Sequence, residues 1–157
     1  MEWSNIEFLL KSILSRLLLI PSFLGRTYTD RISVVKIQDA INEAIELHRG
    51  RYGFGVIEES KLKRIEEVNE SINRVRGSRN RFAHFCWSRF TDDSIFGTNF
   101  SGGLPETKKG RKGSKLLTSQ ELDILYRESY SIVEELSEIV QSLPELDEKT
   151  IARIAKA

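Results

Sequence analysis

Apolar residues recur every three to four positions in four long stretches of this chain, and this spacing restricts the fold more than any other feature. The stretches run over 6–20, 30–49, 58–75 and 119–143. Residues three and four positions apart lie on one face of a helix, so each stretch can bury a stripe and leave its charged residues in water. The sequence therefore predicts an all-α fold, an antiparallel bundle of four to five helices.

Helix-breaking and helix-capping residues stand near the ends of these stretches. Pro21 ends the first helix, a linker through Gly25 follows, and Thr29 or Asp30 caps the second helix. The buried stripe expected for this second helix consists of Ile32, Val35, Ile41, Ile45 and Leu47. The run 118–121 (T-S-Q-E) has the pattern of a capping box and predicts the start of the last long helix.

The segment 88–118 has a different composition, with five glycines, a proline and too few apolar residues to form a second core. We therefore expect a polar loop or a short β-hairpin, inserted between the third and fourth long helices of a single domain that spans 1–157. A short helix over 147–156 closes the chain in this prediction. The insertion carries a basic arm with Lys108, Lys109, Arg111 and Lys112. Such a run either contacts an anionic partner or is a solvated loop.

The composition excludes several classes of protein. Lys and Arg number 24 and Asp and Glu 23, so any attraction of an anionic partner must come from local clusters of charge. A single cysteine and two histidines are too few for a zinc site built from these residues, and they fit a reducing compartment. The apolar stretch 6–20 is too short to span a membrane and lacks the features of a signal peptide. The sequence predicts a cytoplasmic protein with no metal and no cofactor.

The densest cluster of chemically active side chains is the run 76–87, R-G-S-R-N-R-F-A-H-F-C-W. Glycine followed by serine predicts a kink or a restart of the helix at 77–78. On an unbroken helix Arg79 and His84 would point about 140° apart. Asn80 and His84 would share a face. An irregular turn after the break would allow Arg79 to bend towards His84, so the break matters for any joint role.

Arginine and histidine together suffice for one kind of reaction on RNA. Histidine exchanges a proton near neutral pH, and arginine offers a charged, planar fork to a phosphate. These roles permit cleavage of the RNA backbone by its own 2′-hydroxyl without a metal.

Other candidate residues are weaker. His48 is expected at a helix C-terminus or on the surface, and Cys86 is expected to be an inert core thiol on a helix. Phe85 and Trp87 either pack in the core or stack on bases.

The run 79–84 resembles the Arg-polar-x-x-x-His motif of HEPN-domain proteins, and the aromatic residues after it are similar to those of bacterial members. This resemblance implies a metal-independent endoribonuclease, a toxin or an antiviral-defence effector, that acts on RNA as a homodimer with a composite site. An antitoxin or another regulatory partner would restrain it. Arg79 and His84 would be catalytic and Asn80 would orient them, and as cationic neighbours Arg76 and Arg81 would contact the substrate together with the basic arm. The alternative is a non-catalytic HEPN-like module that binds RNA, a nucleotide or another protein.

Overall fold

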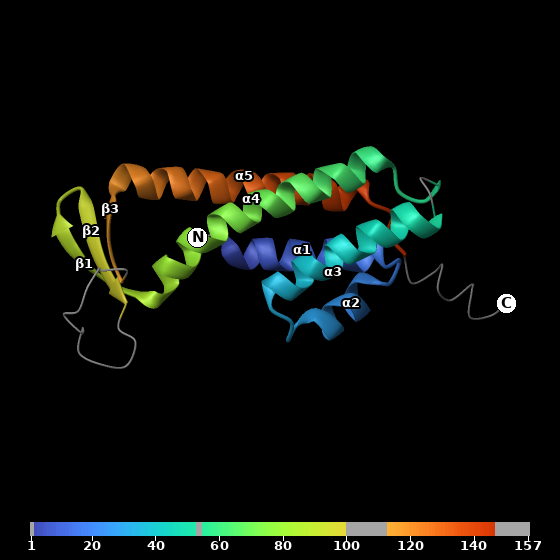
Figure 1. Ribbon diagram of the computed structural model, residues 1–157, viewed down its shortest axis with the longest axis horizontal. Coiled ribbons are helices and arrows are strands. Elements are labelled where there is room, and N and C mark those ends of the chain that lie inside the picture. The colour runs from blue at the N-terminus through green and yellow to red at the C-terminus, as the bar shows by residue number, and fades with distance from the viewer. Residues whose placement is uncertain (1, 53–54, 100–112, 147–157) are drawn as a thin grey trace.

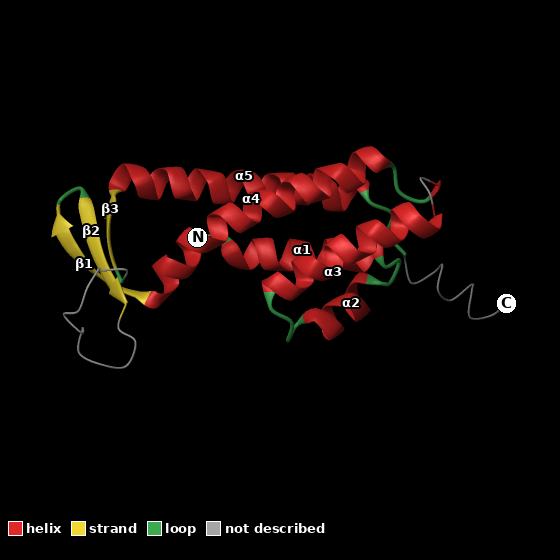
Figure 2. Cartoon of the chain, in the orientation of Figure 1, coloured by secondary structure: helices red, strands yellow, loops and turns green. Residues whose placement is uncertain are grey.

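The computed structural model describes residues 2–52, 55–99 and 113–146, in which helices dominate and a small antiparallel sheet lies at one end (Figures 1 and 2). In chain order the elements are α1 (Trp3–Leu17), α2 (Ser22–Thr29), α3 (Val34–Leu47), the π-helical segment η1 (His48–Tyr52), α4 (Glu59–His84), β1 (Phe85–Thr91), β2 (Ser94–Asn99), β3 (Ser114–Thr118) and α5 (Ser119–Ser142). The predicted helical character is confirmed within these residues. The basic arm and the short helix expected over 147–156 lie outside them.

Helix α1 lies at the centre of the helical part, packed against α2, α3 and α5, while α4 packs mainly against α5. Helices α1, α3 and α5 run in one direction and α4 runs back between them (Figure 1). The largest fully buried side chains are Ile6, Leu10, Ile13, Ile37, Ile41, Ile45, Ile57, Leu62, Ile65, Ile72, Leu136 and Ile139. Across the described ranges, no helix combines the length and the apolar character needed to cross a membrane.

The linker predicted after Pro21 is wrong, because the chain there forms the short helix α2. Gly25 is buried in this helix, and a Cβ atom at its position would lie 1.8 Å from Ser15 Oγ. A glycine read as a linker residue is therefore the point where α2 and α1 approach most closely. An eight-residue helix contributes too few periodic positions to be recognised from the sequence.

The second predicted helix starts later than expected, after Ser33 instead of Thr29 or Asp30. Thr29 belongs to α2, and its hydroxyl donates to the carbonyl of Gly25 at 2.8 Å. As a consequence three members of the expected stripe are exposed, namely Ile32, Val35 and Leu47. The buried stripe of α3 consists of Ile37, Gln38, Ile41, Ala44 and Ile45.

The restart predicted at 77–78 is wrong, because α4 continues as one helix through Gly77 to His84. Contacts on both sides of the glycine hold this part of the helix: Val75 is buried, and the guanidinium of Arg79 lies over the ring of Trp3. A glycine in a helix costs about 1 kcal/mol, which such neighbours can offset. Nothing lies within 4 Å of a Cβ built on Gly77.

The predicted loop or hairpin is a three-stranded antiparallel sheet in the order β1-β2-β3. β1 begins directly after α4, and Ile95 of β2 pairs with Leu117 of β3. β3 leads into α5 through the predicted capping box, which is confirmed: the hydroxyl of Thr118 accepts from the backbone N–H of Glu121, whose carboxylate accepts from the backbone N–H of Thr118. The sheet therefore connects the end of α4 to the start of α5.

Two glycine substitutions should have opposite effects on stability. Gly77→Ala should raise the free energy of unfolding by about 0.5–1 kcal/mol, because the site is helical and open. Gly97→Ala should lower it by about 1–3 kcal/mol, because the added Cβ would lie 2.6 Å from the ring of Trp87. Urea denaturation of both variants measures these changes in the free energy of unfolding. A Gly77→Ala protein that is less stable than the parent would contradict the unbroken helix.

Candidate functional site

The candidate site is the last three turns of α4, where the arginines and the histidine of the motif lie. Here the helix passes the N-terminal end of α1 and continues to the sheet (Figure 1). Three of the motif's neighbours, Trp3, Gln38 and Trp87, come from α1, α3 and β1. The surroundings of the motif are therefore built from elements far apart in the sequence.

Arg79 points to the core side of α4. Its guanidinium carbon lies 5.1 Å from the centroid of the Trp3 ring, and Nη1 donates to Oδ1 of Asn80 at 3.1 Å. Trp3 is only 7% exposed and donates from Nε1 to Glu7 at 2.6 Å, so the ring is a fixed platform. A cation over an indole face is attracted by the negative charge density of the ring. In one copy of the chain Arg79 is thus held by Trp3 and Asn80.

His84 lies apart from Arg79. Its side chain is exposed and has no hydrogen-bond or ion-pair partner among the described residues. Because α4 is unbroken, the two side chains leave the helix about 140° apart. Asn80, which is also exposed, shares the face of His84. The structure therefore brings Arg79 and Asn80 together and leaves the imidazole accessible to solvent.

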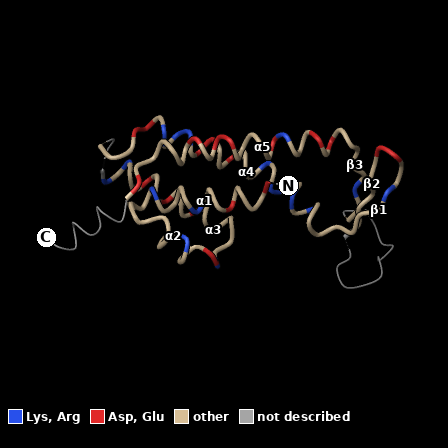
Figure 3. The backbone as a smooth tube through the Cα atoms, turned by 180° about the vertical axis from the view of Figure 1, so that it is seen from behind, with Lys and Arg blue, Asp and Glu red and all other residues tan. Residues whose placement is uncertain are grey.

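Four arginines on this part of α4, at positions 74, 76, 79 and 81, have no carboxylate partner within the described ranges. No acidic residue occurs from 71 to 84, and the acidic positions of α4 lie in its first half (Figure 3). Cations near a helix C-terminus are stabilised by the helix dipole, which explains part of this pattern. The four form what we call the arginine segment, a stretch of α4 that ends near His84 and whose arginines make no ion pair within the described ranges.

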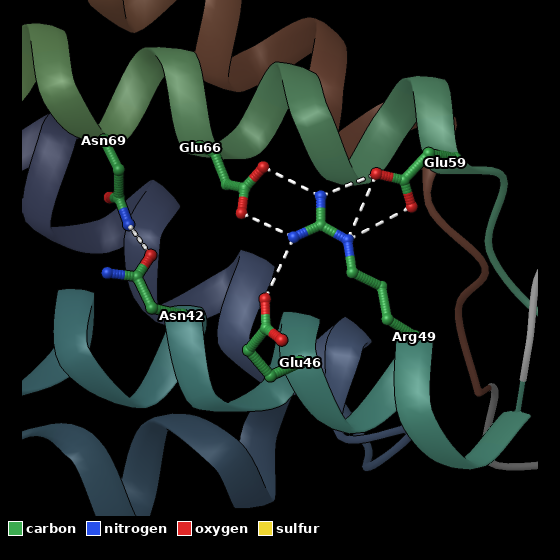
Figure 4. A network of polar contacts seen from close by, with 6 residues as sticks. All are labelled: Asn42, Glu46, Arg49, Glu59, Glu66 and Asn69. Carbon is green, nitrogen blue, oxygen red and sulfur yellow. Dashed lines mark hydrogen bonds and ion pairs between the residues drawn. The ribbon is translucent and has the colours of Figure 1, made fainter.

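Arg49 shows the opposite arrangement at the other end of α4. Its guanidinium donates to the carboxylates of Glu46, Glu59 and Glu66, with N···O distances of 3.0, 2.6 and 2.8 Å (Figure 4). The hydrogen bond to Arg49 lowers the pKa of Glu66 below its usual value. Arg64 likewise contacts Glu135 and Glu138 of α5. Arg49 and Arg64 are thus paired with acids of neighbouring helices, whereas the arginines of the arginine segment are not.

Arg76 is anchored by a buried amide that the sequence analysis did not identify. Its Nη1 donates to Oε1 of Gln38 at 3.1 Å, and Nε2 of Gln38 donates to the carbonyl of Asn69 at 3.1 Å. Both amide side chains are 3% exposed, and Asn69 also donates to Asn42 (Figure 4). The sequence signal for this buried amide was the presence of a glutamine, Gln38, on the apolar stripe of α3. The network fixes Arg76, so this predicted substrate contact has a structural role as well.

Arg81 lies on another side of α4, in a groove of about 200 Å³. Nε donates to the carbonyl of Gly77 at 3.3 Å. The groove is lined by Ser78, Arg81, Trp87, Lys115, Leu117, Glu121, Ile124, Leu125 and Glu128. Its two cations face two carboxylates, so the groove carries no net charge and is less suited to a polyanion than the surface around His84.

The aromatic residues after the motif form a packed joint. The ring of Trp87 lies 5.3 Å from that of Phe82 and 5.7 Å from that of Phe85, and its Nε1 donates to the carbonyl of Phe82 at 2.8 Å. Packing is therefore the role the structure gives to Phe85 and Trp87. The position expected for Cys86 is wrong, because it lies on β1 and is exposed.

The expectation for His48 is wrong as well, since this residue is 2% exposed. Its Nε2 lies 2.7 Å from the carbonyl oxygen of Leu17, which links η1 to the end of α1. His48 lies four residues after Ala44 and three after Ile45, so it falls on the continuation of the buried stripe of α3. His84 is therefore the exposed histidine of the chain and the one accessible to a substrate.

Among residues 2–52, 55–99 and 113–146, no group of three or more His, Cys, Asp or Glu side chains could hold a metal ion. Comparisons of the chain with models of protein families, with curated proteins and with solved structures give no significant match.

The contact between Arg79 and Trp3 predicts a difference between the two motif residues. Arg79→Met should lower the free energy of unfolding by about 1 kcal/mol, because the cation over the indole is lost. His84→Ala should change it by less than about 0.5 kcal/mol, since its side chain is exposed. Chemical denaturation gives both values, and Arg79→Lys is the control that keeps the charge. Equal losses in Arg79→Met and His84→Ala would contradict the described geometry.

The pairing of Glu66 with Arg49 predicts a pH-dependent contribution to stability. Since the pKa of Glu66 is lowered in the folded chain, its carboxylate stabilises the fold above the ordinary value of 4.5, and the effect is lost as the pH falls through the lowered pKa. Glu66→Gln should therefore be less stable at pH 7, by up to about 1 kcal/mol. The difference in the free energy of unfolding between Glu66→Gln and the parent should disappear in acid.

Denaturation series from pH 7 to pH 2.5 measure this dependence, with Glu67→Gln as the control. Glu67 is more exposed, and Lys63, its one ion-pair partner among the described residues, lies 4.0 Å away. A constant difference between Glu66→Gln and the parent over the whole range would rule out the assigned cause.

Proposed function

We propose that the chain is a metal-independent endoribonuclease of the HEPN type, a toxin or an antiviral-defence effector that acts in the cytoplasm. One observation carries the proposal: the exposed imidazole of His84 ends a stretch of three helical turns that holds four arginines without an ion-pair partner in the described chain. An uncompensated cationic cluster attracts a polyanion, and the exposed histidine can exchange protons with it. The finer architecture, an antiparallel HEPN-like bundle in a single domain, belongs to the same proposal.

Histidine performs the proton transfers in this mechanism. An imidazole takes the proton of a ribose 2′-hydroxyl, the new O2′–P bond forms, and the P–O5′ bond breaks. A second imidazole in its charged form gives a proton to the leaving 5′-oxygen. The products are a 2′,3′-cyclic phosphate and a 5′-hydroxyl. Arginine stabilises the charge that develops on the phosphate, and no redox partner or metal is consumed.

The geometry of one copy supports the proposal of a homodimer. Arg79 lies over Trp3 and His84 points about 140° away, so a single chain does not place both groups around one phosphodiester. Two copies that face each other would supply two imidazoles, one as base and one as acid, with arginines from both chains. Asn80 would orient Arg79, to which it already bonds. An antitoxin or other regulatory partner would restrain such an enzyme.

A non-catalytic module that binds RNA, a nucleotide or a protein is the second candidate. The same divergence of Arg79 and His84 favours it, because a lone copy could attract RNA through the arginine segment without assembling a catalytic pair. The two candidates differ in whether RNA fragments are formed.

Cleavage of RNA in the presence of EDTA tests the proposal. His84→Ala and Arg79→Ala should each reduce the cleavage rate by at least about 100-fold, the usual contribution of a general acid–base group or of a charge-stabilising group. Arg74→Ala removes one charge of the arginine segment outside the motif. It should weaken RNA binding severalfold at low salt and leave the cleavage rate at saturating RNA unchanged.

Fragment length and end groups are read on gels, and folding of each variant is checked by circular dichroism. RNA that is bound and left intact by the parent chain would favour the second candidate. Undiminished cleavage by His84→Ala would contradict the catalytic assignment.

A further inference from the structure

The three-stranded sheet has one packed face and one open face. Towards the helices lie Trp87, Gly97 and Leu117, of which Gly97 and Leu117 are buried. Side chains alternate between the faces along each strand, so Phe96 and Leu116, which pair across β2 and β3, lie on the opposite, outer face. Phe90 joins them at the irregular position of β1, where the register shifts between Arg89 and Thr91.

The outer face carries large apolar side chains that the described chain does not cover. Phe90 is 64% exposed and Leu116 is 44% exposed. The rings of Phe90 and Phe96 lie 6.4 Å apart at an angle of 42°, which confirms that they share this face. The other residues on it, Cys86, Ser88, Thr98 and Ser114, are small, so the rings are not shielded by long neighbours.

The size and position of this face favour one occupant. Three apolar side chains are too few for a stable protein interface, which buries about 1,200 Å² or more. Aromatic rings on an open sheet instead stack unpaired bases, at about 1–3 kcal/mol per base. The hydroxyls of Ser88 and Thr98 flank the rings and can bond to base edges.

The outer face also continues directly from the arginine segment. β1 begins at the residue after His84 without a linker, and Phe90 lies six residues further on, about 20 Å along an extended strand. A few nucleotides of an extended single strand cover this distance. Phosphates at the arginine segment and bases on the sheet are therefore compatible with one bound strand.

We infer that the outer face of the sheet, formed by Phe90, Phe96 and Leu116, binds unpaired bases of single-stranded RNA whose backbone lies on the arginine segment. This inference rests on the proposed function and deepens it, because it names single-stranded RNA as the substrate class. A duplex keeps its bases stacked within the helix, so it cannot occupy the face.

Fluorescence anisotropy tests the inference with a labelled single-stranded RNA oligonucleotide and with the same strand annealed to its complement. The full chain with His84→Ala prevents cleavage during the measurement. In this background Phe90→Ala and Phe90→Leu should each weaken binding of the single strand about tenfold, while Phe90→Trp should bind at least as tightly. Duplex binding should be the same in all of them.

The matched control is Tyr126→Ala on α5. Tyr126 is 51% exposed and also belongs to a ring pair, with Tyr130 at 6.3 Å, but it is a residue of α5 and not of the sheet. The Tyr126→Ala substitution should leave binding of the single-stranded RNA unchanged. Normal thermal unfolding of each variant shows that the sheet is intact.

The outcomes separate the inference from the proposed function. If the parent chain binds or cleaves RNA and the Phe90 variants bind the single strand as tightly as their background, the inference is overturned and the proposed function stands. If Phe90→Leu alone binds the single strand as tightly as its background, the contact at this position is apolar and does not involve stacking on a base. This result would also overturn the inference. Failure of every form of the chain to bind any RNA would overturn the proposed function, and the inference with it.

Discussion

The continuous course of α4 is the constraint on which the rest of the structure depends. Its first half contributes buried side chains to the core and forms ion pairs with residues of opposite charge on neighbouring elements. Its second half passes the core, and the contact between Arg79 and Trp3 keeps it helical past Gly77. Because the helix does not break, the direction of each motif side chain is set by the helical repeat, and the sheet begins where the helix ends.

This geometry divides the arginines of the chain into two groups with different physical roles. Arg49 and Arg64 are surrounded by carboxylates and join one helix to another, so their charge is neutralised where it lies. Those of the arginine segment bond only to neutral oxygens or lie over a ring. Their charge is available to an anionic partner, and it is concentrated within three turns next to His84. These unpaired charges are the basis on which we propose a polyanion as the partner of this end of the molecule.

The sequence predicted the helices that supply long apolar stripes and the capping box at Thr118, because these patterns are local. It did not predict α2, whose key residue Gly25 is explained only by a close approach to Ser15. It also misplaced the start of α3, since several capping residues precede that helix. The break expected at Gly77 was wrong because contacts from α1, distant in the sequence, stabilise the helix there. The motif itself was visible in the sequence, whereas the divergent directions of its Arg79 and His84 side chains in the structure were not.

The central claim is that one copy of the chain does not assemble the proposed catalytic pair, so that cleavage requires two. The most direct test is the cleavage rate per mole of chain over a dilution series, with the mass of the protein measured by sedimentation at the same concentrations. The account predicts a rate that falls together with the fraction of dimer. A chain that is monomeric throughout and cleaves RNA at a constant rate per mole would contradict it.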